Sequence, residues 1–216
     1  EVEFVPGSGD QAVELVASGQ ADLALGLRPD WNHADRIDYS GYYLLHGERL
    51  MVRMNDQIRG FSDLGGGRIV LTPSNEQTAA ARAVATAESV NARIEIEQVP
   101  ENSLAFALLV DEDMEAHAAF GDSLKLIPHV QSNPDLLRLT RTEDDSEPRW
   151  YSKSVMALGV PRNDIDFRLL VEYTLQELIR DGTLERLLQP LTLPGEQPVL
   201  EIWPGSSSYL GFDLSR

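Results

Sequence analysis

One uninterrupted run, residues 19–53, constrains the fold of this chain more than any other feature. It reads GQADLALGLRPDWNHADRIDYSGYYLLHGERLMVR. In order, this pattern predicts the end of a helix, a buried strand at 21–26, a polar loop, an aromatic patch and a second strand at 48–53. A continuous apolar strand next to a helix is typical of a parallel sheet that is covered on both faces. The run therefore favours an α/β architecture.

Strands and helices alternate through the rest of the chain as well, which supports the same fold class. Short apolar runs predict strands, and apolar residues at helical spacing behind a capping aspartate predict helices. The predicted strands lie at 2–6, 68–72, 92–99, 115–121 and 155–160, and the predicted helices at 10–19, 75–89, 104–110 and 164–182.

Size and charge narrow the classes of partner. The chain has 216 residues, enough for one large domain or two small lobes with real cores. Its net charge is −17, which disfavours nucleic acid and anionic membranes because phosphate binding needs clustered Lys and Arg. No apolar run approaches the roughly 20 residues of a membrane span.

Motifs for catalysis or cofactor binding are weak. The chain has no cysteine, so it has no thiolate metal site, and its four histidines lack metal-ligand spacing. The glycines at 65–67 precede a strand, whereas a phosphate-binding loop follows one. The acidic cluster at 111–115 lacks the spacing of a calcium loop and is typical of a solvated turn. We therefore predict no catalytic residue, no metal and no cofactor.

Several short motifs occur together in a specific order. Gly26 is followed at fixed spacing by Tyr39-Ser40 and Tyr42-Tyr43, and further on come FGDSL at 120–124, VMALGVPRND at 155–164 and DGTLERLL at 181–188. In this order and spacing the chain, from its start to about Gln189, resembles the family 3 extracytoplasmic solute-binding proteins of the polar amino-acid-binding type.

The resemblance implies a two-lobed periplasmic binding protein type II architecture with a ligand cleft between the lobes. Lobe 1 would comprise residues 1–52 plus 156–216, and lobe 2 residues 53–155. It implies an amino-acid-like solute bound by hinge closure, either for delivery to an ABC-type transporter permease or within a sensor fused to a signalling domain. It also implies a periplasmic or extracellular location, with the signal peptide outside this chain.

The resemblance places four candidate ligand-binding residues in the loop of the first lobe. His33 stands where the family has its carboxylate-binding Arg, and Arg28 and Asp30 stand where it has two Thr residues. Arg28 could bind the same carboxylate from its own position, or it could be a solvated surface charge. Trp31 could form a cleft wall or pack between the loop and the lobe. A solute other than an ordinary α-amino acid is a further alternative.

In the second lobe the resemblance points to two groups. Ser74, Asn75 and Glu76 precede a predicted helix, whose N–H groups could face an anion, although plain N-capping is the alternative. Asp122 matches the family's ammonium-binding Asp, and a turn residue after Gly121 is the alternative.

The two ends depart from the family pattern. The family has a strand and a helix before the segment that matches 2–6, whereas the tail at 198–216 resembles that opening strand followed by G-F-D. Tandem repeats, circular permutation and chance are three explanations. We predict that 199–203 pairs as a strand beside 2–5, within the chain or in a strand-swapped dimer, and that Trp203 is the family's stacking aromatic.

Two rival functions remain open at this point. Some members of the superfamily are cyclohexadienyl dehydratases, and in this chain Glu76 is the candidate general acid for such chemistry. A degenerate interaction module that binds no solute is the other rival, because the family's usual Arg and its first helix are both missing. The leading prediction is a binding protein and not an enzyme.

Overall fold

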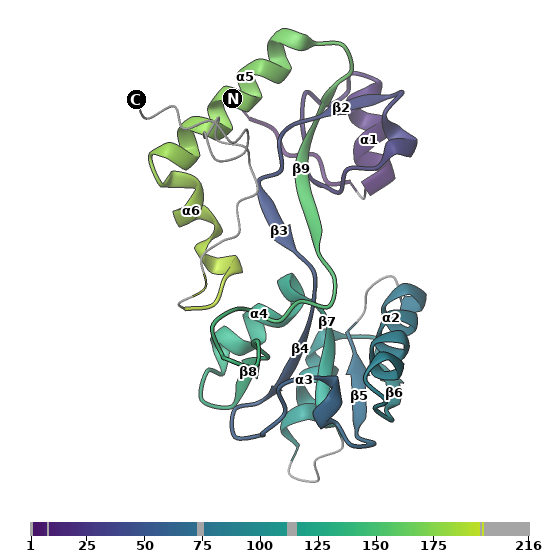
Figure 1. Cartoon of the computed structure of the whole chain (residues 1–216). Helices are drawn as coiled ribbons and strands as arrows, with labels where there is room; N and C mark the ends of the chain where they lie inside the picture. The colour runs from purple at the N-terminus through teal and green to yellow at the C-terminus, as the bar shows by residue number, and fades with distance from the viewer. Residues whose placement is uncertain (1, 8, 73–75, 112–115, 195, 197–216) are drawn as a thin grey trace. The chain divides into compact units, whose positions relative to one another are not determined.

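The computed structural model describes residues 2–7, 9–72, 76–111, 116–194 and 196, without the side chains of 76–78 and 102 (Figure 1). The chain forms two compact units. Unit 1 contains Glu1–Leu45 and Ser154–Gln189, and unit 2 contains His46–Lys153 and Pro190–Gln197. The chain therefore passes from one unit to the other after residues 45, 153 and 189.

These units differ in their bounds from the lobes expected from sequence. The expected first lobe ran to residue 52, but residues 46–52 belong to unit 2. The reason is hydrogen bonding, because β4 (Glu48–Arg53) pairs on both sides with strands of unit 2. Residues 190–197 also lie in unit 2. The expected lobes, 1–52 plus 156–216 and 53–155, remain a proposal.

Unit 1 is built on a small antiparallel sheet. Its central strand β9 (Ser154–Pro161) pairs with β1 (Ala24–Leu27) on one side and with β2 (Ile37–Tyr39) on the other, and β3 (Leu44–His46) also pairs with β9. The helical segments along unit 1 are α1 (Gly9–Ala17), η1 (Trp31–His33), α5 (Ile165–Arg180) and α6 (Thr183–Leu188), with η3 (Gln189–Leu191) following.

The core of unit 1 is small. Helix α1 buries Val13 and Val16 against apolar side chains of β1 and β2, and Gly19 follows it with a φ of 72°. Helix α5 buries only Leu175 fully. Many large apolar side chains of this unit are exposed by 40% or more: Val2, Phe4, Val5, Leu25, Trp31, Tyr42, Ile165, Leu169, Leu170, Tyr173 and Leu187.

The strand predicted at 2–6 is not formed. Residues 2–7 have no regular secondary structure, and Val2 and Phe4 are 78% and 79% exposed. A strand is stable only with a neighbour that takes its backbone hydrogen bonds, and no strand among the described residues pairs with this segment. The expected partner, 199–203, lies outside the described residues.

Unit 2 contains a mixed five-stranded sheet in the order β6-β5-β7-β4-β8. The strands β6 (Glu95–Gln98), β5 (Arg68–Leu71) and β7 (Ala118–Asp122) are parallel. Strand β4 runs antiparallel to both β7 and β8 (Leu137–Leu139). The parallel sheet expected from the apolar strands is therefore only its β6-β5-β7 part.

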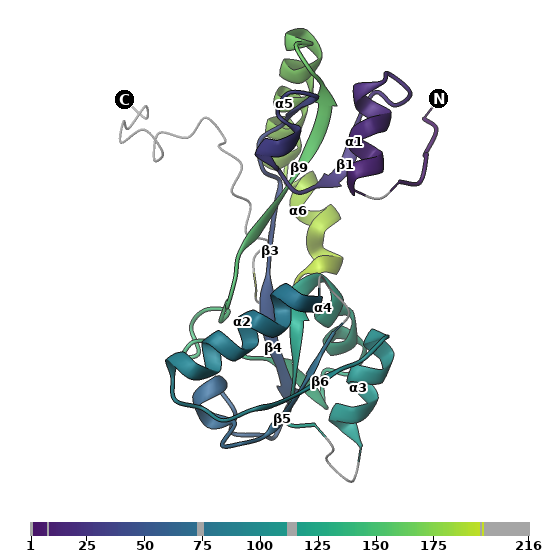
Figure 2. The same cartoon turned by 90° about the vertical axis from the view of Figure 1, so that its right-hand side faces the viewer.

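Helices cover both faces of this sheet (Figures 1 and 2). On one face α2 (Glu76–Ser89) and η2 (Phe61–Asp63) pack against alternate residues of the strands, including Ile69 and Phe120. On the other face α3 (Asn102–Val110) and α4 (Ser123–Ser132) pack against the intervening residues, including Val70 and Ala119. The alternation of side chains along each strand produces this division.

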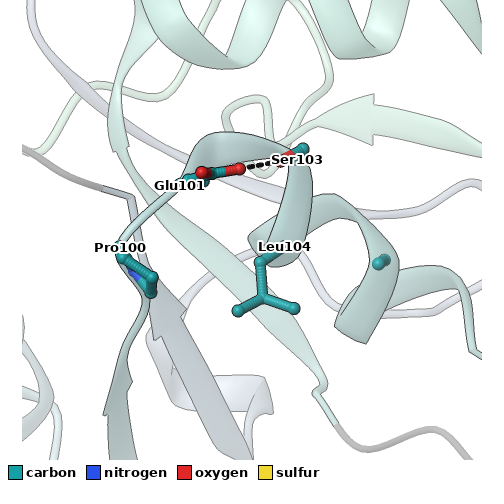
Figure 3. A pocket seen from close by; sticks show the side chains of 5 residues that line it. Pro100, Glu101, Ser103 and Leu104 are labelled. Carbon is teal, nitrogen blue, oxygen red and sulfur yellow. Dashed lines mark hydrogen bonds between the residues drawn. The ribbon is translucent and has the colours of Figure 1, made fainter.

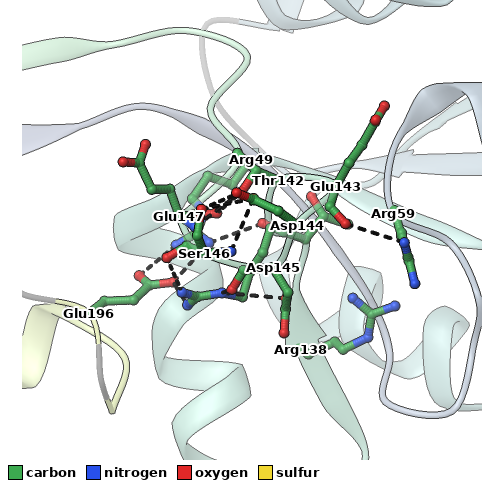
Figure 4. Close-up of polar contacts among 12 residues, drawn as sticks. Arg49, Arg59, Arg138, Thr142, Glu143, Asp144, Asp145, Ser146, Glu147 and Glu196 are labelled. Carbon is green, nitrogen blue, oxygen red and sulfur yellow. Dashed lines mark hydrogen bonds and ion pairs between the residues drawn. The ribbon is translucent and has the colours of Figure 1, made fainter.

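A buried ion pair ties the segment at 190–197 to unit 2 (Figure 4). The side chain of Arg49 is fully buried, and its guanidinium donates to Glu196 Oε2 at 2.8 Å and to Glu196 Oε1 at 3.0 Å. It also donates to the carbonyl oxygen of Thr140 and lies over the ring of Trp150, 5.2 Å from its centroid. A paired carboxylate is what makes a buried guanidinium tolerable.

Candidate functional site

The carboxyl ends of β5, β6 and β7 meet at one edge of the sheet of unit 2. The chain leaves β5 toward α2 on one face and leaves β7 directly into α4 on the other face. In open α/β sheets, ligands bind outside the carboxyl ends where neighbouring strands lead to opposite faces. The gap between the ends of β5 and β7 is therefore the candidate site of unit 2.

Asp122 lies at this point, as the last residue of β7 and the N-cap of α4. Its Oδ1 accepts a hydrogen bond from Leu124 N at 2.9 Å. Its Oδ2 lies 2.7 Å from Nδ1 of His46, the last residue of β3. The side chain of Asp122 is 26% exposed and that of His46 only 12%. The carboxylate is thus held in place on both oxygens and remains partly open to solvent.

The neighbouring strands approach closely because Gly121 has no side chain. A Cβ at this position would lie 1.8 Å from the hydroxyl oxygen of Thr72, the residue that follows β5. The Thr72 hydroxyl is buried, and no hydrogen-bond partner exists for it among the described residues. The site therefore contains a buried polar group beside Gly121, the residue before Asp122.

An ion pair joins β4, the strand next to β7, to helix α2. Glu48 lies opposite Asp122 in the antiparallel register of β4 and β7. Its carboxylate forms an ion pair with Arg82 of α2, and its backbone N–H donates to the Ser152 hydroxyl at 3.1 Å. Glu48 and Asp122 therefore each have a basic partner, Arg82 for the first and His46 for the second.

In unit 1, two tyrosine hydroxyls hold the loop that the sequence singled out. Gly26 N donates to Tyr43 Oη at 3.0 Å, and Asp30 N donates to Tyr39 Oη at 3.5 Å. Burial raises the pKa of both tyrosines, so their hydroxyls stay protonated. Gly26 has a φ of 68°, a backbone conformation that favours glycine. The aromatic patch is therefore the support of this loop.

The four candidate residues of unit 1 lie in and just after this loop. Asp30 caps η1, and the hydrogen bond from Asn32 N at 2.9 Å lowers its pKa, with smaller contributions from His33 and Arg28. His33 Nε2 lies 3.5 Å from Asp10 Oδ1 of α1. Arg28 is exposed, and Trp31 is 94% exposed.

The structure therefore gathers Arg28, Asp30, Trp31 and His33 in one segment of unit 1 and places Asp122 at the sheet edge of unit 2. The candidates Ser74, Asn75 and Trp203 lie outside the described residues, as does the side chain of Glu76, the first residue of α2. The ligand role of all nine residues remains a prediction.

Sequence reasoning missed His46, Thr72 and the Glu48–Arg82 pair. His46 and Asp122 are 76 positions apart, and Glu48 and Arg82 are 34 apart. No local pattern marks such pairs, because they depend on how strands are ordered in the sheet. The one sequence signal for Thr72 was its position at the end of the predicted strand 68–72, because ligands bind beside the carboxyl ends of such strands.

Other features of the described residues do not form a second site. A pocket of about 350 Å³ near the start of α3 is lined by Pro100, Glu101, Ser103, Leu104 and Ala107 (Figure 3). Its one hydrogen bond between side chains joins Ser103 Oγ to Glu101 at 3.1 Å. Within the described ranges, no three His, Asp or Glu side chains are placed to hold a metal ion, and no helix is long and apolar enough to cross a membrane.

Comparison with known protein families identifies the family of this chain. The family described as bacterial extracellular solute-binding proteins, family 3, matches residues 1–191. The chain belongs to this family. Glutamate-binding protein GluB of Corynebacterium efficiens is similar to this solute-binding protein, being 22% identical over 213 residues. That match covers 97% of this chain and 69% of GluB.

Solved structures are similar to the solute-binding protein in fold. An ancestral cationic amino acid solute-binding protein matches with a TM-score of 0.68 at 19% identity, over 88% of this chain and 77% of the other. The L-cystine solute receptor of Neisseria gonorrhoeae, in its unliganded open conformation, matches with a TM-score of 0.67 at 20% identity. That match covers 88% of this chain and 75% of the receptor. The predicted fold class, the two-lobed type II periplasmic binding protein architecture, is confirmed.

Proposed function

We propose that the chain binds a small, amino-acid-like solute and that Asp122 accepts its ammonium group. The observation that carries this proposal is the partly exposed carboxylate of Asp122 at the carboxyl edge of β7, anchored by Leu124 N and His46. Membership of the solute-binding family supports it. So do the names of relatives, which describe proteins for glutamate, cationic amino acids and L-cystine.

We propose that Arg28 binds the carboxylate of this solute. A guanidinium matches a carboxylate in shape and donates two parallel hydrogen bonds. Arg28 is exposed in the loop that Tyr39 and Tyr43 support, whereas the His33 ring lies beside Asp10. Under this proposal Asp30 fixes the loop by capping η1, and Trp31 offers its exposed ring to the apolar part of the solute.

Three residues that precede or begin α2, namely Ser74, Asn75 and Glu76, stay in the proposal as ligand contacts near a helix N-terminus. Closure of two lobes around the solute is what the family resemblance implies for the mechanism, and a solute that favours the closed state shifts the population toward it. Small-angle scattering with and without solute measures that change directly.

We propose a role outside the cytoplasm, in the periplasm or beyond the cell, in keeping with a family of extracellular proteins. There the chain would deliver solute to an ABC-type transporter permease or act as a sensor fused to a signalling domain. The dehydratase alternative requires a general acid, for which Glu76 is the candidate. Dehydration of a cyclohexadienyl acid that is lost in Glu76→Gln would favour the enzyme over the binding protein.

The surface of unit 1 supports the proposal that 199–203 adds a strand there. Strand β1 lies at an edge of its sheet, Leu25 on it is 60% exposed, and Phe4 in the segment 2–5 is 79% exposed. An unpaired edge beside exposed apolar side chains is a place where another strand binds. The strand would come from the same chain or, in a strand-swapped dimer, from a second copy.

Thermal unfolding with a panel of amino acids, polyamines and small carboxylic acids tests the proposed function. A solute present at about 100 times its dissociation constant stabilises the folded chain by about 2.7 kcal/mol. We expect at least one amino acid to raise the melting temperature and Arg28→Ala to abolish the shift. A folded chain that responds to no compound in the panel would favour the degenerate module instead.

A further inference from the structure

We propose that His46 and the solute's ammonium group compete for the carboxylate of Asp122, so that solute binding releases a proton from His46. This inference rests on the proposed function, because it takes Asp122 as the ammonium-binding residue. It assigns to His46 a role that the sequence did not indicate, which is to make solute capture depend on pH.

The geometry gives the single carboxylate of Asp122 two cationic partners, His46 and the solute's ammonium group. Oδ1 of Asp122 is taken by Leu124 N at 2.9 Å, while Oδ2 lies 2.7 Å from His46 Nδ1. The imidazole is largely covered and the carboxylate is more open, with side-chain exposures of 12% and 26%. An ammonium group that reaches Asp122 from solvent therefore meets Oδ2 with the imidazole already beside it.

The charge on His46 decides how well this carboxylate attracts a cation. A protonated imidazole balances Asp122 and repels an incoming ammonium group a few ångströms away. A neutral imidazole still donates its Nδ1 hydrogen to Oδ2, which keeps the carboxylate in position but leaves its charge uncompensated. A solute that prefers the neutral form must, by linkage, drive the proton off.

The charged residues next to this pair in the fold or in the sequence lie on β4, α2 and α4 and in the segment before β9. Glu48 of β4 lies opposite Asp122 and is paired with Arg82 of α2. Helix α4 carries Lys125, and the backbone of Lys153 packs against Gly47, the residue after His46. Histidine is the side-chain type that changes charge between about pH 5 and 8, and His46 is the histidine among these groups.

Direction and size of the effect follow from this arrangement. We expect the solute to lose affinity as the pH falls through the range in which histidine side chains change charge, about 8 to 5. A like charge at contact distance near a protein surface weakens binding by about tenfold or more. Proton release approaches one per solute bound at a pH where the free protein is protonated at His46.

Isothermal titration calorimetry with L-glutamate, L-lysine, L-arginine and L-cystine, from pH 5 to 8, provides the test. At pH 6, titrations in phosphate and in bis-Tris differ in apparent enthalpy if protons are released. We expect that difference, together with an affinity at least about tenfold weaker at pH 5 than at pH 8. A wild-type affinity that is flat with pH, or equal enthalpies in both buffers, would overturn the inference.

His46→Asn separates charge from position, since its amide can still donate to Oδ2 but carries no positive charge. We expect this variant to bind with a flat pH profile and no proton release. His129→Gln, on α4 but stacked on Phe106, serves as the control and should keep the wild-type profile. Retention of the wild-type profile by His46→Asn would contradict the competition.

Wild-type NMR covers the case in which His46→Asn does not fold. The His46 ring resonances at pH 6 should move toward the neutral imidazole on addition of the binding amino acid. Unmoved resonances in a protein that binds would overturn the inference and leave the proposed function intact. Absence of binding to all four amino acids at pH 8 would overturn the proposed function, and this inference with it.

Discussion

The hydroxyl oxygen of Thr72 occupies the space that a side chain on Gly121 would need, because a Cβ there would lie 1.8 Å away. Gly121→Ala should therefore destabilise the fold by about 1–3 kcal/mol, the usual cost of overpacking. Urea unfolding measures this change. Gly9→Ala is the matched control, since a Cβ on Gly9 meets nothing within 4 Å.

A double variant sharpens this prediction. Thr72→Ala removes Oγ1, the atom closest to the new Cβ, and Cγ2, so Thr72→Ala/Gly121→Ala should lose less stability than the sum of the two single changes. We expect a coupling of about 0.5 kcal/mol or more in favour of the double variant. Strict additivity of the two substitutions would contradict the close approach of β5 and β7.

The strands that were predicted well are those whose signal is local. The continuous apolar runs of β4, β5 and β9 mark buried strands wherever they are placed, and they formed close to the expected positions. Helix α4 was not predicted, because Pro128 lies inside it and interrupts the helical pattern. The strand expected at 2–6 was wrong, since a strand also needs a neighbour that the local sequence does not reveal.

Glu196→Ala should be strongly destabilising because it leaves the guanidinium of Arg49 buried without its carboxylate. Loss of one partner of a buried ion pair costs about 3–5 kcal/mol. Glu177→Ala is the control, since Glu177 forms a surface pair with Arg180 and such pairs contribute less than about 1 kcal/mol. Chemical denaturation of both variants checks the contrast, and equal losses would argue against the buried pair.

Asp144 provides a prediction about pH. Hydrogen bonds from the hydroxyls of Thr142 and Ser146, at 2.6 and 2.8 Å, lower its pKa to about 2. A carboxyl whose pKa is lower in the folded state contributes stability above its unfolded value, and that contribution is lost as the pH falls toward 2.

The substitution Thr142→Val removes the larger of these two contributions. It should raise the pKa of Asp144 toward 3.8, the ordinary value. NMR titration of the Asp144 side chain in wild type and variant measures the shift. Unchanged titration in Thr142→Val would mean that the hydroxyl does not bond to this carboxylate in solution.

Deletion of 198–216 tests the proposed strand addition to unit 1. If 199–203 pairs at the exposed edge of this unit, its loss should increase hydrogen exchange in β1 and α1 while β4 and β7 keep their protection. Light scattering of the full chain distinguishes the two sources, because a swapped strand requires a dimer. Identical exchange in both chains would contradict the strand addition.

Of the candidate site, only residues that belong to a short sequence motif could be predicted. Asp122 could be found because the motif FGDSL at 120–124 resembles the family's motif and contains it. The pairing of His46 with Asp122 could not, since it depends on β3, β4 and β7 being adjacent in space. The same holds for Thr72 beside Gly121, which is set by the parallel register of β5 and β7.

The most direct test of the account is calorimetric binding of an amino acid to wild type and to Asp122→Asn. The amide oxygen of this variant can still cap α4 through Leu124 N, but the charge that attracts an ammonium group is gone. Asp164→Asn, which alters the N-cap of α5 in the same way, is the control. We predict that Asp122→Asn weakens binding at least about tenfold while Asp164→Asn binds like wild type. Equal binding by wild type and Asp122→Asn would contradict the central claim.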